Sequence, residues 1–75
     1  MHTASILFYI RDSLDDITIK MVDEKLRKVP GVIAPWFNPE RDHLLFVYFN
    51  PEKTRASVLL NKVRKFGLDA KIIDF

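Results

Sequence analysis

Three aspartates, Asp12, Asp15 and Asp16, form the closest group of side chains in the sequence that could do chemistry. Carboxylate oxygens suit hard cations such as Mg²⁺, Ca²⁺ or Mn²⁺, so a weak metal site is one interpretation of this group. The same residues stand just before a helical pattern, where short carboxylates cap a helix and complement its dipole. We favour the helix cap, because three aspartates without a bidentate glutamate make a poor metal cage.

The rest of the sequence offers little else that could catalyse a reaction or hold a cofactor. The chain has no cysteine, which excludes disulfides and thiolate metal sites. The two histidines, His2 and His43, are too far apart in sequence to form a ligand pair such as His-x3-His. Glycine occurs only at Gly31 and Gly67, so a glycine-rich phosphate loop is absent, and no Ser, His and Asp triad is recognisable. We therefore predict a non-enzymatic protein without a cofactor.

The length and charge of the chain limit its size class and its partners. Its 75 residues suffice for a single domain, 1–75, and 48% of them are hydrophobic, as in a folded globule. Twelve Lys and Arg residues against ten Asp and Glu give a net charge of +2, which is too small by itself to indicate nucleic acid as the partner. No apolar stretch is long enough to span a membrane, and residues 1–10 lack the pattern of a signal peptide. We expect a cytoplasmic protein without membrane insertion.

A strand and a helix are expected in the first part of the chain. Residues 5–10 are an apolar run rich in aromatic and β-branched types, which predicts a buried strand. Ser13 or Asp15 can then cap a helix, which ends at Pro30 and Gly31 because proline removes a donor and glycine accepts a positive φ. The apolar positions of this helix recur at spacings of three, four and three residues, at Ile19, Val22, Leu26 and Val29.

A β-hairpin is expected in the middle of the chain. Two apolar runs, 32–37 and 44–49, are joined by the turn-forming stretch 38–42. Pro35 cannot donate a hydrogen bond to a strand ladder. The first strand of the hairpin is therefore expected at an edge of the sheet or with a bulge.

A second helix and a last strand complete the predicted fold. Thr54 can cap a helix that ends at Gly67 and buries Leu59, Val63 and Phe66. The last strand covers roughly residues 69–74. The order βαββαβ predicts the α+β class and a ferredoxin-like sandwich, in which a four-stranded antiparallel sheet carries two helices on one face.

The alternation of side chains along the strands assigns the two faces of this sheet. One side of the strands should meet the helices, through Ile6, Phe8, Ile10, Leu45, Val47, Phe49 and Ile72. The opposite side should point away from both helices, through Leu7, Tyr9, Trp36, Leu44, Phe46, Tyr48, Ile73 and Phe75. Monomers seldom expose a wide apolar and aromatic patch, so this second side predicts an interface. A register slip or bulge at Pro35 is the alternative, since it would turn some of these residues inward.

The sequence resembles the heavy-metal-associated domains of copper chaperones, of mercury-binding periplasmic proteins and of metal-pumping ATPases. The resemblance covers nearly the whole chain. It depends on the order and spacing of five features, namely Leu26, the run 29–32 (Val-Pro-Gly-Val), Asn38, the run 47–51 (Val-Tyr-Phe-Asn-Pro), and Val63 four residues before Gly67. It implies the βαββαβ fold and, in the family, the binding and transfer of soft metal ions.

The chain departs from this family at the metal loop. Counting back from Pro30 places the family's G-M-x-C-x-x-C loop at residues 12–18, with Asp15 and Thr18 at the two cysteine positions. The aromatic residue that the family usually has beside the loop is here Leu68. Copper(I) and mercury need thiolates, which a carboxylate and a hydroxyl do not replace. The function implied by the resemblance is therefore not supported by these residues.

Three functions remain as hypotheses. The first is protein contact through the outward side of the sheet, as a homodimer or with another protein domain, as an accessory to metal handling or transport. The second is binding of a hard metal or iron at 12–18. The third is single-stranded RNA, with Tyr9 and Phe46 stacking bases as in RNA recognition motifs, which share this element order. RNA is disfavoured, because the glycines of that motif are missing and the basic residues concentrate on the helices.

Overall fold

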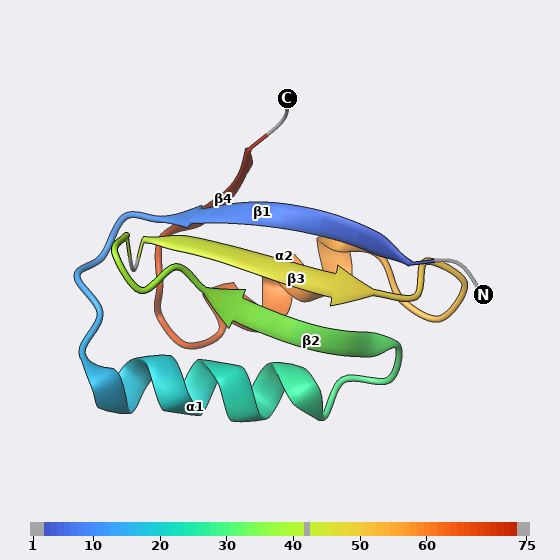
Figure 1. The fold of residues 1–75 in the computed structure, drawn as a ribbon, viewed down its shortest axis with the longest axis horizontal. Helices are drawn as coiled ribbons and strands as arrows, with labels where there is room; N and C mark the ends of the chain where they lie inside the picture. The colour runs from blue at the N-terminus through green and yellow to red at the C-terminus, as the bar shows by residue number, and fades with distance from the viewer. Residues whose placement is uncertain (1–2, 42, 74–75) are drawn as a thin grey trace.

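The computed structural model describes residues 3–41 and 43–73. The elements are β1 (Ala4–Ile10), α1 (Asp16–Arg27), β2 (Val32–Phe37), β3 (Leu44–Phe49), α2 (Ala56–Arg64) and β4 (Ala70–Ile73). The strands form one antiparallel sheet in the order β2-β3-β1-β4, and the two helices pack on one side of it (Figure 1). The predicted ferredoxin-like α+β sandwich is confirmed.

The core lies between the helices and one face of the sheet. Seven inward-facing strand residues were expected there, and all seven belong to the core or pack against it: Ile6, Phe8, Ile10, Leu45, Val47, Phe49 and Ile72. Val22 and Leu26 of α1 and Leu59 and Val63 of α2 meet them, each fully buried. The helices therefore use one side of the sheet only, which fixes which strand residues remain for other contacts.

Helix α1 begins at the aspartate cap. Asp15 has extended backbone angles, and its Oδ1 accepts a hydrogen bond from the backbone N–H of Thr18 at 2.7 Å. The helix ends at Arg27, so Val29 lies just beyond it, although its side chain still packs against the core. Gly31 follows with a φ of +95°, a conformation that a residue with a Cβ adopts only at a cost.

Helix α2 begins one residue later than predicted. Its N-cap is Arg55, whose side chain makes no capping hydrogen bond, so the prediction of a Thr54 cap is wrong. The Thr54 N–H donates to the carbonyl of Asn50 at 3.1 Å, and its methyl group lies under Gly31. Because the tertiary packing takes the Thr54 side chain inward, its hydroxyl is buried and finds no partner within the described part of the chain.

Strand β2 shows both features expected from Pro35. It is an edge strand, and its register with β3 shifts between Val32 and Ala34. Pro35 itself is buried opposite Val47, on the core side, and Trp36 is opposite Phe46. The bulge thus precedes the proline and leaves Trp36 on the outer side. In residues 3–41 and 43–73, neither helix has the length and apolar character needed to cross a membrane.

Candidate functional site

The side of the sheet that faces away from the helices is the first candidate site. Seven of the eight residues predicted for it lie within the described residues, and we call this set the outer face: Leu7, Tyr9, Trp36, Leu44, Phe46, Tyr48 and Ile73. Phe75, the eighth, lies outside the described residues. None of the seven belongs to the core between sheet and helices. Strand pairing brings them together across all four strands.

The centre of the outer face is a group of apolar side chains on adjacent strands. Leu7 is the register partner of Phe46 on β3 and of Ile73 on β4, and Phe46 is the partner of Trp36 on β2. The rings of Trp36 and Phe46 have centroids 5.8 Å apart. One row across the sheet therefore reads Trp36, Phe46, Leu7, Ile73, and each member is a large apolar side chain.

Exposure within the outer face is uneven. Trp36 is 46% exposed and Tyr48 40% exposed, whereas Leu7 is only 7% exposed. Leu7 lies outside the core cluster, between its cross-strand partners Phe46 and Ile73, and contributes little accessible surface. Ile33, next to the bulge on edge strand β2, is 49% exposed, and sequence alternation alone did not predict it. The accessible apolar surface is consequently concentrated toward β2 and β3.

A polar end borders the outer face at Tyr9. The His43 ring stacks on the Tyr9 ring with centroids 5.9 Å apart, and Lys71 Nζ lies 5.7 Å from the Tyr9 centroid. His43 Nδ1 is 2.8 Å from the carbonyl oxygen of Ile10, which fixes the imidazole beside the strand end. His43 and Lys71 therefore compete with a base for contact with the Tyr9 ring. The sequence did not predict this arrangement, because His43 comes from the hairpin and Lys71 from the last strand.

The loop before α1 is the second candidate site, and its carboxylates already bond to the backbone. Hydrogen bonding from Thr18, first from its side chain and then from its backbone N–H, holds the pKa of the Asp15 carboxyl below its ordinary 3.8. Asp12 Oδ2 accepts a hydrogen bond from the Asp69 N–H at 2.7 Å and ties the loop to the start of β4. Within the described residues, no three Asp, Glu or His side chains gather as a metal site would need. Asp12 and Asp15 thus bond within the loop and at the helix start, and Asp16 lies in the first turn of α1.

No protein-family model matches the chain, and no curated protein matches it either. Solved structures do match. Oxidized MerP from Ralstonia metallidurans CH34 has a TM-score of 0.84 at 18% identity, over 97% of this chain and 100% of that one. The N-terminal domain of a potential copper-translocating P-type ATPase from Bacillus subtilis, in its Cu(I)-loaded state, has a TM-score of 0.84 at 24% identity, over 95% and 88% of the two chains. A copper-binding domain of another P-type ATPase, HMA7, has a TM-score of 0.82 at 17% identity and 93% coverage of both.

This chain has the fold of the heavy-metal-associated domains. The family resemblance of the sequence, carried by residues 26–67, is thereby confirmed at the level of the fold. The match covers 97% of this chain for MerP and 95% for the Bacillus subtilis domain. The heavy-metal-associated fold is here combined with a sequence without cysteine. At the two positions where the family carries thiolates, Asp15 and Thr18 bond to each other and close the helix start. These residues do not fit a soft metal ion.

Proposed function

We propose that this chain is a non-enzymatic interaction domain that associates with a second copy of itself through the outer face. The observation that supports the proposal is the pair of exposed aromatics, Trp36 and Tyr48, on a sheet face that neither helix covers. Trp and Tyr are enriched at the energetic centres of protein interfaces, and an uncovered apolar face of a monomer more often marks an interface than free surface.

The composition of the outer face suits an isologous contact. In a twofold dimer the same patch of both chains must be complementary to itself, which an apolar row such as Trp36, Phe46, Leu7 and Ile73 can be without charge conflict. The charged groups Lys71 and Arg41 stand at the Tyr9 end, where a polar rim is expected. Burial of the exposed parts of the aromatics then supplies the association energy.

The fold also leads us to propose a role in metal handling, but one that does not include binding a soft metal ion. Its structural neighbours include a copper-binding domain of a P-type ATPase and the N-terminal domain of a potential copper-translocating P-type ATPase. Since Asp15 and Thr18 offer no thiolate, we assign this chain an accessory role in metal handling or transport, in which it contacts a partner and carries no soft ion itself. The lack of cysteine agrees with the reducing cytoplasm as the site of action.

The test is the oligomeric state of matched variants. Light scattering coupled to size-exclusion chromatography should give a concentration-dependent dimer for the wild type and a monomer for Trp36→Asp. Ile17→Asp is the control, because it removes a 71% exposed apolar residue from the first turn of α1, away from the outer face. A wild type that stays monomeric at millimolar concentration, or a dimer that Trp36→Asp leaves intact, would contradict the proposal.

A further inference from the structure

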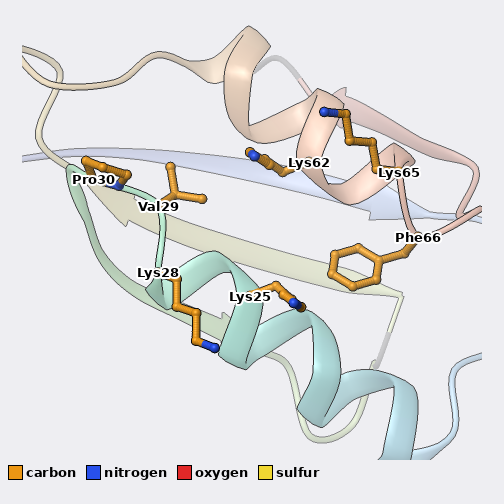
Figure 2. A pocket seen from close by; sticks show the side chains of 7 residues that line it. All are labelled: Lys25, Lys28, Val29, Pro30, Lys62, Lys65 and Phe66. Atoms are coloured by element: carbon orange, nitrogen blue, oxygen red, sulfur yellow. The ribbon is translucent and has the colours of Figure 1, made fainter.

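A groove between the two helices lies on the side of the molecule opposite the outer face (Figure 2). It has a volume of about 470 Å³. Its lining is four lysines and three apolar residues: Lys25, Lys28, Lys62, Lys65, Val29, Pro30 and Phe66. The lysines come from both helices, and the ring of Phe66 extends from the end of α2 toward the α1 side. The groove thus combines cations at its rim with an apolar floor.

The lysines of the groove have no neutralising carboxylate among the lining residues. Over residues 3–41 and 43–73, the ion pairs are Arg11 with Asp69 and Arg27 with Asp23, and neither includes a groove lysine. Lysines near a helix end are explained in part by the helix dipole. The dipole does not require lysines of two different helices to line one groove, nor an aromatic ring between them. Four like charges around a shared hollow are therefore free to attract an anion.

The lining cations set the charge that a bound anion must carry. Arginine pairs with carboxylates and phosphates alike through two parallel hydrogen bonds in a fixed planar geometry, whereas lysine binds an anion without that geometric requirement. This lining has lysine at all four basic positions and arginine at none. Lysine ammonium groups act as rotatable point charges and suit the several oxygens of phosphate groups. The four positive charges are therefore matched by a multiply charged anion, such as a ligand with more than one phosphate.

The floor of the groove indicates the rest of the ligand. Val29, Pro30 and Phe66 give it apolar surface that an inorganic phosphate would leave uncovered. Phe66 is only partly buried, so one part of its ring remains available to a flat partner. The volume of the groove falls in the range of sites that hold small organic molecules.

We propose that this groove binds an organic polyphosphate with a planar ring, of the nucleoside di- or triphosphate class. The phosphates lie between the helices beside Lys25 and Lys62, and the ring lies against Phe66; the side chains of Lys28 and Lys65, which extend away from the groove in Figure 2, turn toward the bound phosphates. The site is separate from the outer face, so a dimer formed through the sheet would keep both of its grooves open.

The test is calorimetric titration of the full chain with ATP, with inorganic triphosphate and with adenosine, at a salt concentration of about 0.15 M that screens weak surface attraction. ATP should bind, triphosphate should bind several-fold more weakly, and adenosine should show no heat. The double variant Lys62→Ala and Lys65→Ala should weaken ATP binding by about tenfold or more, which corresponds to about 1.4 kcal/mol. Phe66→Leu should weaken ATP and leave triphosphate unchanged.

The matched control is the double variant Lys20→Ala and Lys53→Ala, which removes the same charge from exposed positions outside the groove lining. It should leave ATP binding within about twofold of the wild type, because a change of net charge alone is screened. Equal losses in the two double variants would overturn the proposal, and so would equal affinity for ATP and triphosphate or no binding of ATP. Amide chemical shifts of Lys62 to Phe66 that do not respond to ATP would contradict the assigned place.

Discussion

The indole ring of Trp36 on β2 lies against the ring of Phe46 on β3, with 5.8 Å between the centroids and 46° between the ring planes. The two residues are register partners on the outer face. Such a cross-strand pair contributes to the monomer itself as well as to any contact with a partner. Its contribution to folding must therefore be separated from its contribution to association.

A double-mutant cycle with Trp36→Ala and Phe46→Ala separates the two. At a concentration where the chain is monomeric, we expect urea unfolding to give a coupling free energy of about 0.5–1.5 kcal/mol, as aromatic pairs do beyond their buried area. Light scattering on the same variants then reports the association. Strict additivity of the two unfolding effects would show that the ring contact does not stabilise the monomer.

Asp15 should make the stability of the fold depend on pH. Its carboxylate caps α1 through the Thr18 N–H, and its pKa in the folded chain lies below the ordinary 3.8. The ionised carboxylate therefore stabilises the fold at a pH above the unfolded value, and this contribution is lost as the pH falls through the folded value. Asp15→Ala should lower the melting temperature by a few degrees at neutral pH and by less in acid.

Asp15→Asn separates the cap from the charge. Asparagine is also a good N-cap, so this variant should melt near the wild type at neutral pH and should lose the part of the acid dependence that comes from residue 15. Thermal melts followed by circular dichroism between acid and neutral pH provide the measurement. An unchanged acid dependence in Asp15→Asn would assign the titration to other carboxyl groups.

Thiolates placed at the two family positions should restore soft-metal binding. In the structure Asp15 and Thr18 face each other across the first turn of α1. Cysteines there would lie at a helix N-terminus, which favours the thiolate form. The variant Asp15→Cys with Thr18→Cys should take copper(I) from a chromophoric chelator, whereas the wild type should leave the chelator loaded. A wild type that removes copper(I), Zn²⁺, Fe²⁺ or Mn²⁺ with micromolar affinity would overturn our structural interpretation of the loop.

The two glycines should differ in their tolerance of a side chain. Both have positive φ, +95° at Gly31 and +83° at Gly67. A Cβ on Gly31 would lie 2.8 Å from the Cβ of Lys53, while a Cβ on Gly67 would meet nothing within 4 Å. Gly67→Ala should therefore cost only the conformational strain, about 1–2 kcal/mol, and Gly31→Ala should cost more. Equal losses in urea unfolding would contradict the close approach at Gly31.

Local patterns predicted the elements and their faces because each strand and helix buries one side. Alternation placed Phe8 and Val47 inward and Trp36 outward, Asp15 was one of the two caps predicted for α1, and the glycines expected after the helices have positive φ. The failures arise where tertiary packing decides. Thr54 was expected to cap α2, but its side chain packs inward, and alternation placed Leu7 on the outer side without indicating that it is only 7% exposed.

The basic groove could not be predicted from the sequence alone. The lysines were recognised as helical residues, yet only the antiparallel course of α1 and α2 brings Lys25 near Phe66 and Lys62 near Val29. The polar end at Tyr9 was hidden in the same way, because Lys71 and His43 come from different strands and turns. Contacts between elements distant in sequence determine both sites.

A second copy of the chain is proposed to cover the outer face, and Trp36 reports on this contact directly because it is the sole tryptophan. Its indole is 46% exposed in the single chain. As the concentration rises from micromolar to millimolar, its fluorescence emission should shift to the blue and acrylamide should quench it less, with no such change in a Tyr48→Asp variant. Emission and quenching of the wild type that stay constant over this range would contradict it.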